Sequence, residues 1–183
     1  MGVMHAGENK RILVLGVGNI LLRDEGVGVR VVHELMARYE FPQNVRVVDG
    51  GVLGLKLTGT LMEADEVVVV DAVRGGGEPG TIYRFEWKAR PSHIHYKDSL
   101  HQIDLVEAMA SLELIERCPK VVVLGVEYED INTWEMGLSP KVEAAVERLV
   151  GLVIEELKGL GVEPEPKKEE GAADVSCSSG QGD

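Results

Sequence analysis

Hydrophobic and polar positions along this chain follow two alternating patterns. Four short runs, dominated by valine and leucine, are each closed by a glycine or a charged residue, which is typical of strands buried on both faces of a sheet. These runs are residues 12–15, 45–48, 67–70 and 121–124. A fifth segment, residues 81–88, alternates between apolar and charged side chains and predicts a half-exposed, antiparallel edge strand.

Helical periodicity separates these strands. Apolar residues three or four positions apart predict amphipathic helices, the last of which begins with a serine cap followed by a first-turn proline. We expect helices over residues 27–39, over residues 53–62, from Asp98 or Ser99 through Leu112, and from Ser139 and Pro140 to near Gly159 and Gly161. Strands that alternate with helices predict an α/β fold, with a mostly parallel sheet and helices on both faces.

The length of the chain indicates a single domain. A chain of 183 residues is the size of one compact α/β domain. We assign residues 1–10 to an N-terminal extension and residues 11–162 to the domain, and we find no internal repeat. From residue 163 the chain is mostly proline, glutamate, lysine, serine and glycine, with little to bury. Such a composition predicts a disordered acidic tail over residues 163–183.

Charge and cysteine content narrow the possible partners and location. The formal net charge is −12, which repels phosphate backbones and argues against nucleic acid as a partner. The two cysteines, Cys118 and Cys177, provide no disulfide framework and indicate a reducing compartment. Cys118 lies between Arg117 and Pro119, and we interpret it as a small apolar packing residue.

Targeting and membrane segments are not apparent in the sequence. Residues 1–10 carry mixed charge without the apolar region of a signal peptide. The longest apolar stretch, residues 12–22, is interrupted by Asn19 and is shorter than the roughly 20 residues of a membrane span. We therefore expect a cytoplasmic protein with no membrane partner.

Several familiar motifs begin in this chain and are not completed. Gly16 and Gly18 would open a dinucleotide-binding loop, but Leu21 occupies the position of the third glycine. His33 and Glu34 begin the zinc-protease motif H-E-x-x-H, which Ala37 breaks. The sequence also lacks G-x-S-x-G, P-loop and C-x-x-C motifs. A nicotinamide enzyme and a covalent acyl-enzyme mechanism are therefore disfavoured.

Three acids follow predicted strands. Glu25 lies in the connection after the first strand, Asp49 ends the second, and Asp71 ends the third. Ligands of open parallel sheets bind beyond the carboxyl ends of the strands, and a buried carboxylate must be paired, so these acids are candidate ligands. The alternatives are structural, because Asp49 with Gly50 is a common turn and Asp71 could cap the following segment.

His101 adds a candidate nitrogen ligand. In the first turn of its predicted helix the helix dipole disfavours the imidazolium, so the ring stays neutral, as a metal ligand must be. An ordinary first-turn histidine is the alternative. His93 and His95, on one side of an extended segment after Pro91, form a rival pair. Two carboxylates and one imidazole with an open position suit a borderline divalent ion such as nickel or zinc.

One long stretch of sequence closely matches a known family. Residues 14–28, VLGVGNILLRDEGVG, closely resemble the opening of the hydrogenase maturation endopeptidases, which process the large subunit of nickel–iron hydrogenases. Shorter segments agree with the family in the expected order: residues 49–51, 70–72, 101–102, 124–126 and 137–140. Together they cover about residues 11–160. Val52 and Tyr128 depart from the family, where threonine and proline are common.

The resemblance implies a fold, a reaction and a site. The fold is a three-layer α/β/α domain with about five strands, one of them an antiparallel edge strand. The reaction is the removal of a short C-terminal extension from the nickel-loaded precursor of the hydrogenase large subunit, so the nickel arrives with the substrate. Glu25, Asp71 and His101 match the family's metal-binding residues and become the candidate catalytic residues, and Asp49 matches an acid beside the metal.

Other functions stay open at this point. A different metal-dependent amide hydrolase could use the same scaffold and the same ligands. A non-catalytic nickel chaperone would bind the precursor without releasing a peptide. A nucleotide-binding module would instead bind dinucleotides.

Overall fold

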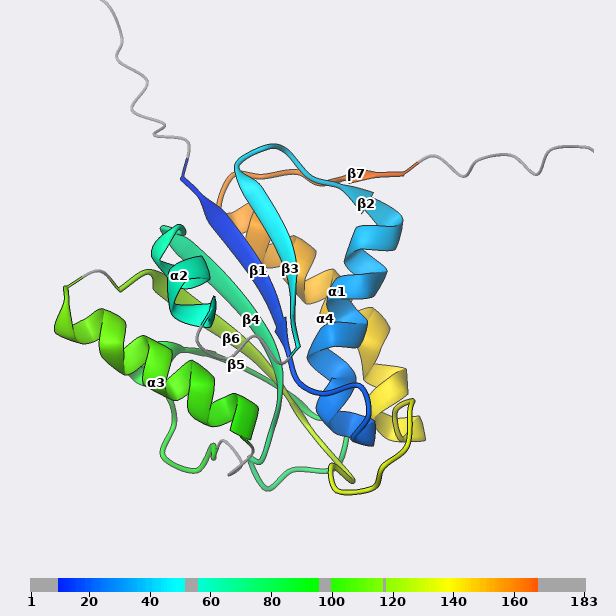
Figure 1. Ribbon diagram of the computed structural model, residues 1–183. Helices are drawn as coiled ribbons and strands as arrows, with labels where there is room; N and C mark the ends of the chain where they lie inside the picture. The colour runs from blue at the N-terminus through cyan, green and yellow to red at the C-terminus, as the bar shows by residue number, and fades with distance from the viewer. Residues whose placement is uncertain (1–9, 52–55, 96–99, 117, 168–183) are drawn as a thin grey trace, which may run out of the picture.

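A five-stranded sheet forms the centre of the protein (Figure 1). The computed structural model describes residues 10–51, 56–95, 100–116 and 118–167, without the side chains of residues 56 and 100–104. In sheet order the strands are β3 (Val45–Gly51), β1 (Ile12–Val17), β4 (Glu66–Val73), β6 (Lys120–Glu127) and β5 (Ile82–Glu86). All neighbours pair in parallel except β5, which is antiparallel to β6. The predicted mixed sheet with an antiparallel edge is confirmed.

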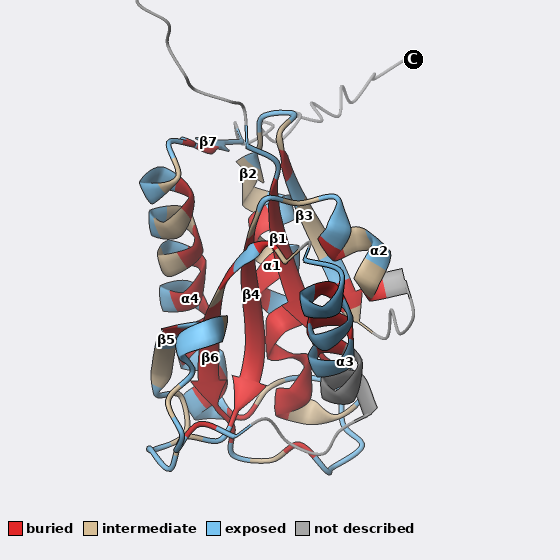
Figure 2. Ribbon diagram, turned by 90° about the vertical axis from the view of Figure 1, so that its left-hand side faces the viewer, coloured by how far each residue is buried: buried red, intermediate tan, exposed pale blue. Residues whose placement is uncertain are grey.

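Helices cover both faces of the sheet. One face carries α1 (Val27–Arg38) and α4 (Pro140–Gly159), and the other carries α2 (Lys56–Met62) and α3 (Leu100–Leu114). Two 3-10 turns, η1 (Arg23–Gly26) and η2 (Trp87–Ala89), complete the connections. Figure 2 shows the central strands buried between these two helical layers. The expected three-layer α/β/α architecture is therefore present.

Alternation along β4 divides the core into two apolar clusters. Val68, Val70 and Ala72 pack with α1 and α4, whereas Val67, Val69 and Val73 pack with α2 and α3. Both faces of this strand are covered, so its sequence is continuously apolar rather than alternating. By the same alternation, Asp71 shares the face of Val69 and Val73, toward α2 and α3.

Close contact between α1 and β1 explains the incomplete dinucleotide motif. A Cβ atom at Gly16 would come within 2.2 Å of the Gly28 carbonyl oxygen, and one at Gly28 would come within 2.4 Å of the Val17 carbonyl oxygen. Only glycine lets the helix approach the strand this closely. These glycines therefore serve helix–sheet packing and bring the start of α1 over the carboxyl end of β1.

The chain end requires a correction. The sequence assigns residues 163–167 to a disordered tail, and this assignment is wrong. A two-residue strand, β7 (Glu165–Pro166), pairs antiparallel with β2 (Tyr39–Glu40), and Lys167 donates a hydrogen bond to the Met36 carbonyl (2.6 Å). Val162 and Pro164 are buried, so the segment has apolar contacts of its own. Residues 1–9 and 168–183, with Cys177, lie outside the described residues.

Within the described ranges, no helix has the length and apolar composition needed to cross a bilayer.

Candidate functional site

Glu25 lies in the 3-10 turn that leads into α1, at the carboxyl end of the sheet. Its side chain is only 3% exposed, and the turn packs against β4. The backbone N–H of Glu25 bonds to the Leu22 carbonyl (3.0 Å), which closes the turn. No described residue gives a hydrogen bond to its buried Oε2 atom. Because an unsatisfied buried carboxylate oxygen is costly, this atom is suited to receive a cation or a donor from a ligand.

Asp71 is an interior residue of β4 rather than its terminus. The sequence ends this strand at residue 70, but pairing with β6 continues to Val73, and Asp71 lies opposite Gly125. Its carboxylate is 1% exposed, and Oδ1 accepts a hydrogen bond from the Ala72 N–H (2.7 Å). Because β4 continues past it, Asp71 does not cap a following segment, and its role as a ligand stays a prediction.

His101 lies in the first turn of α3, as its sequence position predicts. Its side chain and the candidate cap residues Asp98 and Ser99 fall outside the described part of the structure. The helix packs on the face of the sheet toward which Asp71 is directed, and it begins at the end to which the arrow of β4 points (Figure 1). Among the side chains described, no three His, Cys, Asp or Glu residues converge on a metal position. The ligand set that includes His101 thus stays a prediction.

Asp24 is a functional-site residue that the sequence analysis missed. It is fully buried beside Glu25 and accepts four hydrogen bonds from the loop that precedes α4. The donors are the N–H groups of Glu129 (2.9 Å), Asp130 (2.9 Å) and Ser139 (2.6 Å) and the Ser139 hydroxyl (2.9 Å). A carboxylate that accepts several backbone N–H bonds is a strong structural anchor. Asp24 therefore fixes both the turn that holds Glu25 and the loop opposite.

This anchor changes how α4 begins. Ser139 is the N-cap residue, and Pro140 follows in the first turn, as predicted. The Ser139 hydroxyl does not bond to the exposed N–H groups of its own helix, because it donates to Asp24 instead. The sequence offered one usable signal, a second acid directly before Glu25, but its partner lies 115 residues away.

Asp49 lies at the end of β3, on the rim of the site. Its side chain is about 40% exposed; Oδ2 lies 2.8 Å from Nε2 of His33, and Oδ1 accepts a hydrogen bond from the Gly51 N–H (2.9 Å). β3 continues through Asp49 to Gly51, so the expected Asp49–Gly50 turn is not formed, and the carboxylate instead closes a local hydrogen bond at the end of the strand. Asp49 also borders a hollow of about 310 Å³, lined by Gly18, Asn19, Ile20, Val29, Asp49, Gly50 and Gly51. This hollow lies beside the turn of Glu25.

A second buried carboxylate, that of Glu127, holds the loop after β4 at the carboxyl end of the sheet. Glu127, at the end of β6, accepts hydrogen bonds from the Gly75 N–H (2.7 Å) and the Tyr83 hydroxyl (2.9 Å). Burial, together with this hydrogen bond, raises the pKa of Tyr83. The Glu127 carboxylate thus holds the loop after β4 in place by the same means that Asp24 uses.

Arg74 connects this loop to the rival histidine pair. Its backbone exchanges two hydrogen bonds with His95 (3.0 and 2.8 Å), and its guanidinium lies 4.5 Å from the ring centroid of Tyr128. Ile94 is buried between the exposed His93 and His95, but its N–H donates to the Pro91 carbonyl (3.0 Å), so His93 lies in a turn rather than in the extended segment that was expected. Tyr128, which replaces the proline common in the family, therefore has a packing role through Arg74.

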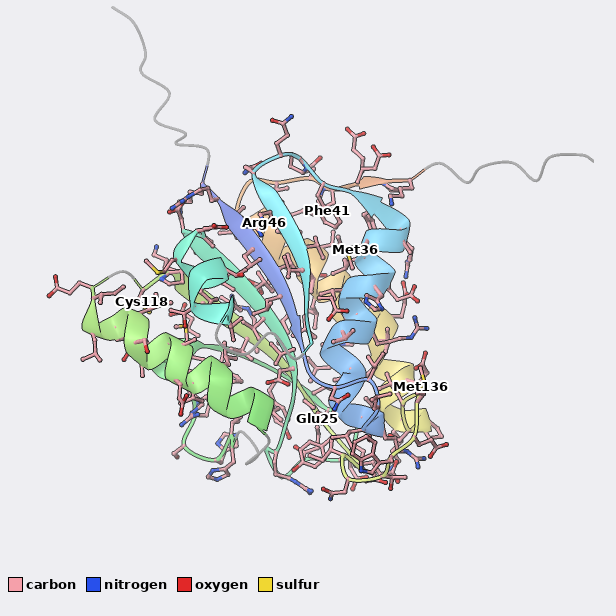
Figure 3. The ribbon with its side chains drawn as sticks, viewed as in Figure 1. Glu25, Met36, Phe41, Arg46, Cys118 and Met136 are labelled. Carbon is pink, nitrogen blue, oxygen red and sulfur yellow. The ribbon has the colours of Figure 1, made fainter. Side chains whose placement is uncertain are left out.

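Cys118 is remote from these acids. It borders a hollow of about 380 Å³ at the amino end of β6, together with Trp87 and Met109, and it packs on the apolar cluster under α3. Figure 3 shows Cys118 and Glu25 at well-separated places in the molecule. Burial raises the pKa of the Cys118 thiol, which makes it a poor nucleophile. The predicted packing role is confirmed.

The fold and these acids define a class of protein: a small α/β enzyme domain with its site at the carboxyl end of a parallel sheet. Residues 29–156 match the hydrogenase maturation protease family (HycI). The chain belongs to this family. It is therefore a peptide hydrolase, an endopeptidase of hydrogenase maturation, as the resemblance implies.

Similar proteins support this assignment. The hydrogenase 2 maturation protease of Escherichia coli (strain K12) is 39% identical over 160 residues, which is 86% of this chain and 97% of the relative. The hydrogenase expression/formation protein HupD of Bradyrhizobium diazoefficiens is 40% identical over 159 residues, 86% of this chain and 83% of the relative. The solved structure of the hydrogenase maturating endopeptidase HybD from E. coli superposes with a TM-score of 0.79 at 38% identity, covering 86% of this chain and 98% of HybD.

Proposed function

We propose that this protein removes a short C-terminal extension from the nickel-loaded precursor of a nickel–iron hydrogenase large subunit, and that it recognises the inserted nickel. The observation that carries the proposal is the buried Oε2 atom of Glu25, to which no described residue gives a hydrogen bond. A metal ion brought by the substrate would supply the missing partner. Asp71, buried in the strand against which the Glu25 turn packs, offers a second carboxylate at the same end of the sheet.

Nickel enters this reaction as part of the substrate. In the precursor it is held by cysteine thiolates, which leave coordination positions open. The proposed ligands for those positions are the carboxylates of Glu25 and Asp71 and the neutral imidazole of His101. A precursor without nickel cannot make these contacts, so the protease would act only after metal insertion.

Hydrolysis has two routes compatible with these residues. The metal could polarise the scissile carbonyl, or a carboxylate could activate a water molecule. Neither Ser139 nor Cys118 is suited to act as the nucleophile of a covalent route. The Ser139 hydroxyl is engaged by Asp24, and Cys118 is remote with a raised pKa.

Intact-mass spectrometry of the precursor tests this proposal. Purified protein is incubated with nickel-loaded precursor and, in parallel, with nickel-free precursor. We expect the nickel-loaded precursor to lose a C-terminal peptide and the nickel-free precursor to keep its mass. Equal cleavage of both would contradict nickel recognition. Stable binding without any loss of mass would instead support a chaperone, and cleavage of small amides without precursor would support a general amide hydrolase.

A further inference from the structure

An exposed apolar surface borders the site. Four large side chains form it, and we refer to them as the apolar rim: Ile20 (43% exposed), Leu21 (45%), Trp134 (77%) and Met136 (70%). They come from two segments more than a hundred residues apart in sequence, one leading into the Glu25 turn and the other leading toward α4. Figure 3 shows Met136 and Glu25 at the same end of the molecule.

Backbone pairing joins the two segments. Leu22 and Glu135 form an isolated parallel bridge, in which the Glu135 N–H donates to the Leu21 carbonyl (3.1 Å). The Arg23 N–H donates in turn to the Glu135 carbonyl (2.9 Å). Trp134 and Met136 flank Glu135 in sequence, so the pairing brings the segment that carries them beside the segment of Ile20 and Leu21. The rim is thus one surface built from both segments.

This surface is held rigidly. Asp24 anchors both segments, and the Arg23 guanidinium forms an ion pair with Glu135 (3.0 Å). Within the loop, the Asp130 carboxylate accepts hydrogen bonds from the Asn132 N–H (2.9 Å) and the Thr133 hydroxyl, which lowers the pKa of Asp130. A preformed surface loses little conformational entropy when a partner binds. Exposed tryptophan and methionine are also residue types enriched at protein interfaces.

Charge around the rim indicates the chemistry of its partner. Glu129, Asp130 and Glu135 flank the apolar residues, and Arg23 neutralises one of these acids. The whole chain has a net charge of −12. A complementary partner therefore presents an apolar segment flanked by lysine or arginine side chains.

We propose that the apolar rim is the docking surface for the hydrogenase precursor. An apolar segment of the precursor, flanked by basic residues, packs on Trp134 and Met136 while the metal reaches Glu25. This inference rests on the proposed function, because the rim adjoins the turn that carries the candidate metal ligand. Docking on the rim supplies affinity and orientation, and the metal contacts restrict cleavage to precursor that already contains nickel.

Binding of nickel-loaded precursor, measured by biolayer interferometry, tests the rim. For the double variant Trp134→Ala/Met136→Ala we expect at least about tenfold weaker binding, the size of effect typical when interface anchors are truncated. In cleavage assays the same variant should raise KM and leave kcat within about twofold, because neither residue touches the reacting atoms. Its melting temperature should match the wild type, since both side chains are exposed.

Two further variants sharpen the test. Leu114→Ala is the matched control, because Leu114 is 86% exposed at the far end of α3, and it should leave binding unchanged. Glu129→Gln should slow association and weaken its dependence on ionic strength, as expected for a charge that steers encounter.

The outcomes separate this inference from the proposed function. Unchanged precursor affinity in the double variant overturns the docking surface, and so does wild-type protein that binds no precursor. A wild-type dimer that the double variant converts to a monomer, detected by light scattering, would assign the rim to a second copy of this chain and also overturn it. Binding that depends on the rim, without release of a peptide, would uphold the surface and refute the protease step.

Discussion

Replacing Asp24 by asparagine keeps the shape of the side chain and removes its charge. The carboxylate now accepts four hydrogen bonds, three of them from backbone N–H groups. An asparagine has one acceptor oxygen, so its NH₂ group must face a donor in either orientation. If the oxygen keeps the three donors of Oδ2, the amide nitrogen faces the Ser139 N–H across the shortest of the four bonds.

The expected cost follows from these contacts. Hydrogen bonds to a charged group are worth roughly 1.5–3 kcal/mol each, and a buried donor left without a partner costs about 1–3 kcal/mol more. Partial relaxation of the loop offsets some of this loss, so we expect Asp24→Asn to destabilise the fold by about 2–4 kcal/mol. For a domain of this size each kcal/mol lowers the melting temperature by about 2–4 °C. The variant should therefore melt roughly 5–15 °C lower.

Differential scanning calorimetry measures this shift, with Ser139→Ala as the matched control. The control removes the hydroxyl donor and leaves the charge and the three backbone donors in place, so its melting temperature should fall less than that of Asp24→Asn. Precursor processing should decrease in Asp24→Asn beyond the decrease in Ser139→Ala, because the turn that holds Glu25 loses its anchor. A melting temperature within about 1 °C of the wild type would refute the argument that Asp24 anchors the site.

Three other predictions follow from the same structure. Glu25→Gln, Asp71→Asn and His101→Ala should each abolish processing of nickel-loaded precursor with the fold retained in circular dichroism. Glu25→Gln should also melt no lower than the wild type, because the Oε2 atom of this buried side chain has no described hydrogen-bond partner to lose. Full cleavage by any of the three variants would exclude that residue. Removal of residues 168–183 should leave activity and melting unchanged, whereas removal from residue 163 should lower the melting temperature, because β7 and Lys167 contact β2 and α1. Hydrogen bonds from Arg11 lower the pKa of Asp65 to about 2. This pair therefore stabilises the fold fully above about pH 4 and loses that contribution as the pH falls toward 2. An NMR titration that gives Asp65 an ordinary pKa near 4 would contradict this prediction.

Much of the fold could be predicted because its signals are local. Runs such as residues 67–70 are apolar on both faces, and that pattern identifies a central parallel strand without knowledge of its neighbours. The alternating segment around β5 identifies the edge strand in the same way. Helix ends were also local, since Ser139 and Pro140 mark the start of α4 and the glycines near residue 160 mark its end.

Features that depend on contacts between distant segments could not be predicted from the sequence. β2 and β7 are two residues each and form only because the chain after α4 returns to the end of α1. The length of β4 beyond residue 70 depends on pairing with β6, which no local pattern reveals.

The residues of the candidate site likewise include some that the sequence predicted and one that it did not. Glu25 and Asp71 are buried, and their role as ligands stays a prediction, whereas Asp49 is exposed and paired with His33. Asp24 was missed because its role is defined by a loop more than a hundred residues further along the chain. A carboxylate in a turn has no local signature that distinguishes an anchor from a surface acid.

Recognition of the precursor depends on carboxylates at the carboxyl end of the sheet that receive a metal ion carried by the substrate. Nickel K-edge X-ray absorption of the enzyme–precursor complex observes this contact directly, with Glu25→Gln and Asp71→Asn as paired controls. We expect the nickel of the precursor to gain oxygen or nitrogen neighbours when wild-type protein binds, and to gain fewer with either variant. A nickel spectrum that stays the same before and after the complex forms would contradict the account.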